Sequence, residues 1–562
     1  MQFIIKSFAG LLILFLPYIS VAQSTYLPQD HKHKQLLERL EIKLQRNADL
    51  NVATPDPLSR RIAVRVAEYA DSLYKTNSEL FTEVDGHNIR SLLMNNSEWV
   101  SGDKSDFSSK RPVWNTFYRT KANFVEVDEP DFFLALNPIL QGQLSMEQDN
   151  DERVFLNSRG LTFRGMIAKR VGFSGYLTEN QERAPGFVMD RVYSSPQAVP
   201  GVGYFKRFKN TALDYFDGRG SIHFTAAKYI DFQFGYDKNF IGNGYRSMFL
   251  SDFGNSYLFL KLNTRIWKLN YQNIFMELTP QYGRGGDRLL DKKYAAIRHL
   301  SINATKWLNL GLFESVIFGR KNTFDFTYLN PVMFLRVAEQ QNGSPDNAMI
   351  GFDFKANIAK KFQLYGQWLL DEFKLNEVRA GNGWWANKFG FQAGAKYIDA
   401  FKINNLDLQG EINMVRPFTY SFRDSIGDFS HYNQPLAHPF GANFVEAVGI
   451  IRYQPHPKWR TMARLIYWTQ GLDSAGSNFG GNIFKLYNTR SADYGFTVPS
   501  GVKADGVNAH LLVSYEPLEN LFIDASLLMR RFNAAEDPSL DQNTNMFTIG
   551  LRLNMFRRDY DY

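Results

Sequence analysis

Alternation between apolar and polar residues, with a strongly polar second face, most restricts how this chain can fold. Across 406–414 the apolar side chains share one face, and the other face holds Asp407, Gln409, Glu411 and Asn413. Four ionisable or amide groups on one face are too costly for the core of a β-sandwich. They suit the water-filled lumen of a membrane barrel whose other face meets lipid. The sequence therefore predicts an all-β transmembrane fold, an antiparallel outer-membrane β-barrel. The pattern recurs at 389–397, 508–515, 521–527 and 546–556.

The connections between these strands alternate between short and long. Each long one would cap a hairpin, since outer-membrane barrels have short periplasmic turns and longer extracellular loops. Nine long loops predict about 18 strands between residues 131 and 556, within a range of 16 to 20. A further strand-like piece at 117–127 would make the number of strands odd. The predicted long loops are 143–160, 177–221, 238–256, 275–296, 318–349, 371–389, 415–444, 469–507 and 531–545.

The N-terminus predicts export, followed by a helical segment. Lys6, an apolar run at 8–19 and small residues before Gln23 are typical of a cleaved signal peptide. Helical periodicity follows at 31–47, 58–74 and 87–99. The predicted parts are a signal peptide at 1–22, a periplasmic helical bundle or plug at 23–115, the outer-membrane barrel at 116–556 and a C-terminal tail at 557–562.

Composition narrows the class of protein. The chain has no cysteine, which excludes a disulfide framework, a thiolate metal site and a lipid-modified cysteine, so the barrel would be the only membrane attachment. A mean hydropathy of −0.33 argues against many membrane helices. Aromatic residues make up 15% of the chain, as expected for rings at both membrane interfaces. A soluble β-propeller would show a fixed repeat, which the sequence lacks. The net charge of +7 is too weak to predict nucleic-acid binding.

The motifs of an enzyme are not found in the sequence. There are nine histidines and no G-x-S-x-G, and His223 and His510 fit polar positions in the lumen better than a catalytic base. The acidic run 148–152 lacks the spacing of a calcium loop. We therefore expect no catalytic residues, no metal and no cofactor.

Aromatic and amide residues in the long loops are the candidate ligand-binding residues. Trp384 and Trp385 lie among glycines and asparagines in one loop, and Tyr432, Asn433 and Gln434 lie in another. Ring faces beside amides suit sugar binding, because the apolar face of a sugar can stack while its hydroxyls form hydrogen bonds. Packing of these residues over the barrel mouth is an equal alternative. The candidate set is completed by Tyr245 and Arg246, from a loop segment that is otherwise typical of a turn.

Four long segments resemble the capsule-assembly Wzi-like outer-membrane family, in particular its branch of gliding-motility outer-membrane proteins. They are DKNFIGNGYRSMFLSDFGNSYLFLKL at 237–262, YLNPVMFLRVAEQQNGSPDNAMIGFDF at 328–354, YGQWLLDEF at 365–373, and RPFTYSF with HYNQPLAHPFGANFVE at 416–422 and 431–446. The resemblance implies an 18-stranded barrel closed partly by periplasmic helices. It also implies a lectin-like role that tethers exported polysaccharide, and it brings no catalytic residues.

The leading functional hypothesis is a non-enzymatic barrel in the cell outer membrane that binds or anchors surface polysaccharide, either capsule or slime, in support of gliding motility. The alternatives are a structural component of an outer-membrane motility or secretion complex, and a solute channel. The expected partners are outer-membrane lipid and lipopolysaccharide, surface polysaccharide, and motility or secretion proteins, with no nucleic acid.

Overall fold

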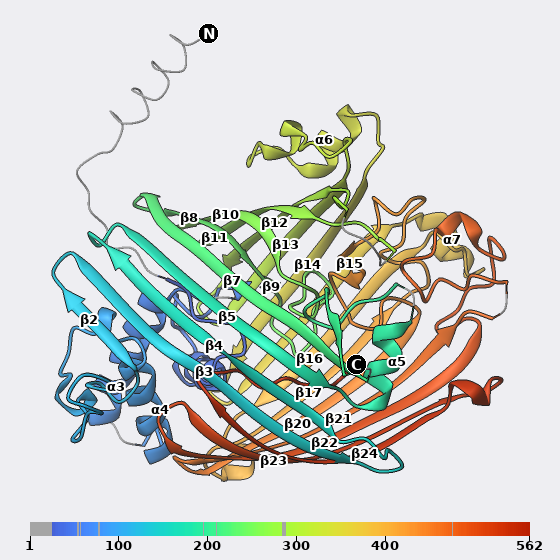
Figure 1. The fold of residues 1–562 in the computed structure, drawn as a ribbon. Helices are drawn as coiled ribbons and strands as arrows, with labels where there is room; N and C mark the ends of the chain where they lie inside the picture. Colours follow the sequence, from blue (N-terminus) through green and yellow to red (C-terminus); the bar gives the residue numbers. More distant parts are fainter. Residues whose placement is uncertain are drawn as a thin grey trace.

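The computed structural model describes residues 25–562 except 53, 54, 57, 77, 78, 195, 210, 284–287 and 475. The predicted signal peptide at 1–22 lies outside the described residues. Eighteen strands of the described chain pair side by side, each antiparallel to the next, in one closed ring (Figure 1). The strands of this wall are β3 (Phe132–Glu147), β4 (Val154–Ile167), β5 (Val171–Arg183), β7 (Ala212–Ala227), β8 (Ile230–Asp237), β10 (Tyr257–Ile266), β11 (Leu269–Leu278), β12 (Lys293–Asn303), β13 (Leu308–Phe318), β14 (Asn347–Ile358), β15 (Phe362–Glu372), β16 (Lys388–Tyr397), β17 (Leu406–Val415), β20 (Phe444–His456), β21 (Trp459–Leu472), β22 (Val502–Leu518), β23 (Leu521–Ala534) and β24 (Gln542–Leu553).

The remaining elements are not strands of this ring. The short strands are β1 (Pro55–Asp56), β2 (Val125–Glu129), β6 (Lys206–Phe208), β9 (Phe240–Ile241), β18 (Ser430–His431) and β19 (Gln434–Pro435). The α-helices are α2 (Lys34–Leu44), α3 (Arg60–Thr76), α4 (Glu83–Met94), α5 (Gly186–Tyr193), α6 (Leu335–Gln341) and α7 (Leu375–Ala380). The short 3-10 helices are η1 (Ser97–Trp99), η2 (Ser105–Phe107), η3 (Phe326–Leu329), η4 (Ala400–Lys402), η5 (Tyr487–Thr489) and η6 (Pro538–Leu540).

The two faces of the wall follow the alternation of the sequence. On β17, Asp407, Gln409, Glu411 and Asn413 are buried in the interior, while Ile412 is exposed on the outside. The outward face of the other strands is mainly apolar, as contact with lipid requires, and the closed ring leaves no unpaired strand edge to the lipid. Exposed outward residues include Leu140, Leu144, Leu161, Ile222, Phe234, Leu312, Ile350, Phe352, Trp368, Phe391, Ile451, Leu465, Leu511, Ile523, Leu527, Phe547 and Ile549. The predicted fold class, an 18-stranded antiparallel barrel, is confirmed.

Several strands are longer than the sequence pattern predicted. β3 and β4 leave a connection of only 148–153 where 143–160 was expected, and the loop predicted at 531–545 shortens to 535–541. The first residues of β24, Gln542 to Asn545, are polar on both faces, so hydrophobic alternation could not reveal them, although their backbone is paired with β23. The piece at 117–127 supplies β2, which pairs with the start of β3 and is not part of the wall.

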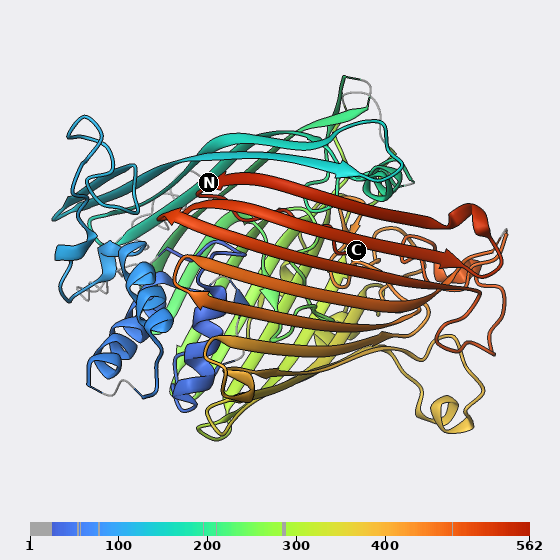
Figure 2. The ribbon, with the colours of Figure 1, turned by 90° about the horizontal axis from the view of Figure 1, so that it is seen from below.

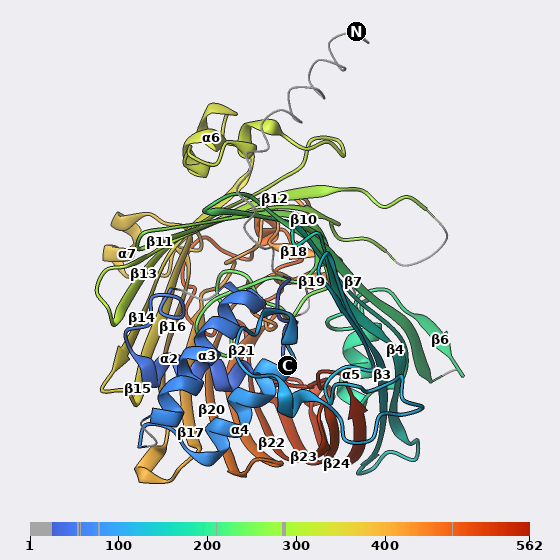
Figure 3. The same ribbon diagram turned by 90° about the vertical axis from the view of Figure 1, so that its left-hand side faces the viewer.

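Three described helices near the N-terminus, α2, α3 and α4, cover the end of the barrel where the short turns lie (Figures 2 and 3). They pack around a core that includes Leu40, Val66 and Leu92. Charged side chains join this helical segment to the wall. The ion pairs between the segment and the wall or its turns include Lys32–Glu516, Glu38–Lys396, Glu41–Lys355 and Glu98–Arg164. The helices therefore close much of the short-turn end.

Arg39 forms the densest of these contacts. Its guanidinium is 3.0 Å from Asp85 of α4, 2.8 Å from Asp399 in the β16–β17 turn, and also bonded to Asp407. Lys43 adds contacts of 2.7 Å to Asp85 and 3.0 Å to Asp399. Asp85 also closes the capping box at the start of α4. We name these five residues the helix anchor.

The helix anchor predicts how docking of the helical segment depends on pH. Burial alone would raise the pKa of Asp85, but Arg39 and Lys43 outweigh it and hold the pKa below its usual range; the pKa of Asp399 is lowered in the same way. A carboxylate with a lowered pKa stabilises the folded state above its unfolded pKa of about 4, and this stabilisation is lost as the pH falls through the folded value.

We therefore expect α2 and α4 to stay docked from neutral pH down to about pH 4 and to be released in stronger acid. Hydrogen exchange of α2 and α4, followed across this range in the full chain, measures the effect. An Asp85→Asn variant should show a weaker pH dependence. Release that begins near neutral pH would contradict the role of these carboxylates.

Candidate functional site

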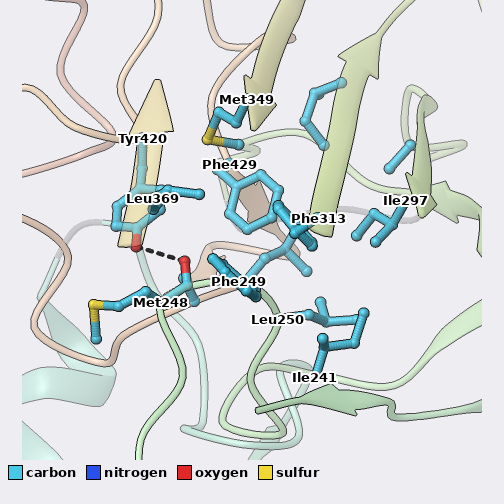
Figure 4. Packing of buried hydrophobic residues seen from close by; sticks show 14 of the residues in the cluster. Ile241, Met248, Phe249, Leu250, Ile297, Phe313, Met349, Leu369, Tyr420 and Phe429 are labelled. Carbon is cyan, nitrogen blue, oxygen red and sulfur yellow. Dashed lines mark hydrogen bonds between the residues drawn. The ribbon is translucent and has the colours of Figure 1, made fainter. Parts of the chain in front are cut away.

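Two long loops and the C-terminal tail fill the interior of the barrel. Met248, Phe249 and Leu250, from the loop between β9 and β10, pack against Phe313 and Leu369 of the wall (Figure 4). The rings of Phe249 and Phe313 are stacked with their centroids 4.4 Å apart. The loop between β17 and β20 adds further apolar residues to the same cluster. Loops therefore occupy the lumen on the long-loop side, and the helices cover it at the short-turn end.

Arg246 lies at the centre of a buried set of charges in the lumen. Its guanidinium is 3.2 Å from Glu446 and 3.0 Å from Asp561. The backbone N–H groups of Arg246 and of the residue before it donate to Glu411 at 3.0 and 2.7 Å. Gly244 permits this approach, because a Cβ there would collide with the Glu411 carboxylate. We name Arg246, Glu411, Glu446 and Asp561 the lumen network.

Tyr245 links the lumen network to β21, the wall strand next to β20. Its hydroxyl donates to Asp561 and accepts from Arg464 at 2.6 Å. Arg464 is also 3.1 Å from Asp559. Burial alone would raise the pKa of Asp561, but Arg246 and Arg464 hold it below its usual range, so it is ionised. Tyr245 and Arg246, two predicted ligand residues, therefore bind the protein's own C-terminal segment.

The tail at 557–562 folds back into the barrel. Tyr560 donates to Glu182 of β5 at 2.6 Å, and Arg558 forms an ion pair with the same carboxylate at 2.9 Å. The ring of Tyr562 lies 4.9 Å from the guanidinium of Arg191 on α5. These contacts place the tail inside the lumen, between the wall and the loop that contains α5.

The loop containing β18 and β19 is held against neighbouring loops by the side chains of Asn433 and Gln434, two of the predicted ligand residues. Asn433 accepts from the backbone of Tyr282 at 3.1 Å, and Gln434 accepts from Gly201 at 2.7 Å. Both are buried, whereas Tyr432 is half-buried and its ring lies 5.0 Å from that of Tyr282.

His431, beside these residues, is a structural histidine. Burial lowers its pKa to about 3, so the ring is neutral. It accepts from the Thr279 amide through Nδ1 at 3.0 Å and donates to the Ser256 carbonyl through Nε2 at 3.0 Å. Its ring therefore joins three loops of the lumen.

Trp384 and Trp385 lie at the long-loop end, where two loops meet. The loop that contains α7 pairs by its backbone with the loop between β21 and β22, because Trp385 donates to the carbonyl of Asp493 at 3.0 Å. Trp385 is held by the Arg490 guanidinium, 4.1 Å from its ring centre, and by the Tyr487 ring at 4.9 Å. Trp384 is partly exposed beside it, with the two ring centroids 6.2 Å apart.

Tyr494 completes this group from the second loop, with 51% of its surface exposed. The Lys374 ammonium lies 5.3 Å from the centre of the Trp384 ring, and polar groups of the same two loops pair nearby, Asn382 with Glu377 at 3.1 Å and Arg490 with Asp493 at 2.7 Å. We name Trp384, Trp385, Tyr487, Arg490 and Tyr494 the rim patch. In the part of the chain that the structure describes, no group of His, Asp and Glu side chains is placed to hold a metal ion.

The seven predicted ligand residues thus lie in three places. The sequence pointed to Trp384 and Trp385 but not to their neighbours from the other loop, Tyr487, Arg490 and Tyr494. These neighbours lie about a hundred residues further along the chain, and no spacing signal connects them. The remaining predicted residues bind other loops or the tail and form no surface shared with the rim patch.

No helix among the described residues is both long and apolar enough to cross a membrane.

Comparison with known proteins gives structural likenesses. No protein-family model matches the sequence. No curated protein matches it either. Among solved structures, Wzi of Escherichia coli, an outer-membrane protein involved in group 1 capsule assembly and described as a carbohydrate-binding β-barrel, matches with a TM-score of 0.54 and 12% identity, over 96% of this chain and 100% of Wzi.

Two outer-membrane proteins match more weakly. OprD of Pseudomonas aeruginosa has a TM-score of 0.41 and 12% identity over 75% of this chain and 94% of its own, and OccAB4 of Acinetobacter baumannii has 0.42 and 9% over 76% and 98%. The predicted resemblance to Wzi is confirmed for the fold, and no comparison bears on the gliding-motility branch. The closed 18-stranded ring and its apolar exterior make this chain a barrel of the cell outer membrane, with the fold of Wzi.

Proposed function

We propose that this protein is a non-enzymatic, closed barrel that binds surface polysaccharide at its extracellular rim. The rim patch is the observation that supports the proposal most directly. It presents partly exposed ring faces beside carboxylate and amide groups, on the side of the barrel opposite the helical segment. Such groups recognise sugars through stacking and hydrogen bonds. Occupation of the lumen by loops and tail favours binding at the surface over passage through the barrel.

Replacing Trp384 and Tyr494 together with alanine is expected to weaken polysaccharide retention about tenfold, because each ring contributes about 0.5–1.5 kcal/mol of contact. Trp385 is left in place because it joins the two loops. Retention is measured as cell-bound polysaccharide and as binding of purified polysaccharide to the reconstituted protein. Trp267→Ala is the matched control, since that ring is 79% exposed at the short-turn end. Equal retention by the double variant and the control would contradict the proposal.

A solute channel is the second candidate. Two cavities of about 200 and 240 Å³ lie between the helical segment and the wall. They are lined by polar residues such as Asn137, Gln233 and Gln272. Steady large openings of the full chain in planar bilayers would favour this function, whereas a closed barrel gives none.

The resemblance to the gliding-motility branch extends the first proposal to a slime polysaccharide. Cells that carry the rim variant would then glide more slowly than cells with the Trp267 control. Motility or secretion proteins that co-purify in fixed stoichiometry would instead favour a structural role in a complex.

A further inference from the structure

The connection between β13 and β14, residues 319–346, lies outside the ring of strands. It leaves the long-loop end of β13, and Figures 1 and 3 show its helix α6 over the outer surface of the wall rather than beyond its end. We name residues 319–346 the lateral arm. Because the outer surface of this barrel faces lipid, the lateral arm lies where a loop of irregular backbone is not expected.

The wall beneath the lateral arm contains two outward-facing residues of opposite charge. Arg298 of β12 and Glu314 of β13 are opposite each other in the strand register. Their neighbours along the strands point inward, since His299 contacts Asp353 in the lumen and Phe313 belongs to the lumen cluster. An outward charge near the middle of a barrel strand costs about 2–4 kcal/mol when it faces lipid. These two charges are covered by the lateral arm instead.

The wall and the lateral arm satisfy each other's polar groups. The Arg298 guanidinium donates to the backbone carbonyls of Tyr328, Asn330 and Met333. Glu314 accepts from the amide of Leu335 at 3.3 Å. These are backbone groups that the short helices of the arm leave without helical partners, and they would be costly to expose to hydrocarbon.

A third polar contact lies closer to the short-turn end. The Tyr271 hydroxyl, near the start of β11, donates to the carbonyl of Pro331 at 2.6 Å. The lateral arm therefore reaches across the wall from the long-loop end toward the short-turn end, at the depth of the membrane.

The underside of the lateral arm is apolar and packed. Tyr328, Leu335 and Ala338 are buried against outward-facing wall residues such as Val316 and Phe318. This packing fixes the arm to the wall and determines which of its side chains point away from it.

The opposite side of the lateral arm is an apolar surface. Val332 is 88% exposed, Phe326 77% and Phe334 66%, and Leu329 and Val337 are also exposed. We name these five residues the crest. No charged residue occurs between 326 and 335, and the nearest charges, on Asp325 and Arg336, lie at the two ends of that stretch. The crest continues the lipid-facing surface formed by wall residues such as Leu312 and Ile350.

We propose that the lateral arm is embedded in the membrane and that its crest binds lipid acyl chains. An exposed crest of this size would be unfavourable in water, whereas in hydrocarbon each of its side chains is stabilised. A membrane environment requires the polar groups of irregular backbone to form hydrogen bonds within the protein. Arg298, Glu314 and Tyr271 provide these hydrogen bonds for the lateral arm. The arm thereby widens the lipid contact of one side of the barrel.

Spin labelling of the full chain in liposomes tests this proposal, because the native sequence has no cysteine and each label needs one substitution. Val332→Cys and Phe334→Cys place a nitroxide on the crest, Leu312→Cys places one on the lipid-facing wall, and Lys321→Cys places one at the polar base of the arm. Collision rates with oxygen, which concentrates in lipid, and with a water-soluble nickel complex are measured for each label.

We expect the ratio of oxygen to nickel collisions at Val332 and Phe334 to match that at Leu312 and to exceed that at Lys321. Nickel collisions as frequent as at Lys321 would overturn the proposal by placing the crest in water. Low collision rates with both reagents would also overturn it, because they would show that a protein surface, such as a second copy, covers the crest.

A second measurement tests the contacts that hold the lateral arm. Arg298→Met leaves the carbonyls of Tyr328, Asn330 and Met333 without their donor, so the label at Phe334 should become more mobile. Arg531→Met is the matched control, because it removes an exposed arginine from β23, away from the arm. Unchanged mobility in Arg298→Met would overturn the role of this arginine.

Discussion

Replacing Arg246 with methionine is expected to lower the free energy of unfolding by about 3–5 kcal/mol, because it removes the counter-charge shared by two buried carboxylates. Glu446 is fully buried and Asp561 nearly so; both form ion pairs with this guanidinium, and without it Asp561 keeps only Arg464, 3.9 Å away. The change is measured as the urea midpoint of the reconstituted protein, or as the temperature at which the compact band is lost on a gel. We expect the tail to be released in the same variant, because Arg246 also donates to the Asp561 carbonyl at 2.6 Å.

Two further variants distinguish the effect of losing the ion pairs from the effect of losing the arginine side chain. The double variant Arg246→Met with Glu446→Gln removes one unpaired charge and should recover part of the stability. Arg531→Met removes an exposed arginine and should change the free energy of unfolding by less than about 0.5 kcal/mol. A urea midpoint for Arg246→Met equal to that of the Arg531 control would show that the lumen network does not stabilise the barrel.

Replacing Arg39 with methionine should undock the helical segment. Asp85 and Asp399 would then share only Lys43, and Asp407 would lose its ion pair and keep the hydrogen bond from Gln35. Breaking one buried ion pair of this kind costs about 3–5 kcal/mol. Limited proteolysis of the reconstituted protein from the short-turn side measures the result. We expect cleavage in α2 to α4 at protease concentrations that leave the native chain intact.

Arg90→Met is the matched control for this variant. Arg90 lies in α4 of the same segment, but its partner Asp106 is exposed, and a surface ion pair contributes only about 0–1 kcal/mol. The barrel strands should remain resistant to protease in both variants. Equal cleavage in the Arg39 and Arg90 variants would contradict the anchoring role of Arg39.

Local alternation predicted the barrel well because each wall strand has to satisfy lipid on one side. On β17 this requirement alone assigns Asp407 and Glu411 to the interior and Ile412 to the exterior. The start of β24, Gln542 to Asn545, is polar on both faces, so no alternation marks it. The seam between β24 and β3 joins residues about 400 positions apart, a pairing that a local pattern does not contain.

The candidate site was predictable only in part, for a similar reason. Trp384 and Trp385 stand out as exposed rings in a long loop, but Tyr487 and Arg490 become their neighbours only because two loops cross at the rim. Arg246 gives no local sign that its partners are Glu446 and Asp561, which are 200 and 315 residues away.

The lateral arm did leave a signal in the sequence. The alternation of β12 and β13 places Arg298 and Glu314 on the lipid-facing side near the middle of the two strands, where the other outward positions of these strands are apolar. A charge at an outward position of a barrel strand indicates that something other than lipid covers it. The covering segment lies in the next long connection along the chain.

The tail inside the lumen has a consequence for the order in which this protein assembles. The residues just before it, Asn554 to Phe556, border a cavity together with Tyr26, Asn95 and Asn96 of the helical segment. Once α2 to α4 have docked, they cover much of the route by which the tail could enter from the short-turn end. We therefore expect the tail to move inside before the helices dock, so that the helical segment, although synthesised first, reaches its final place last.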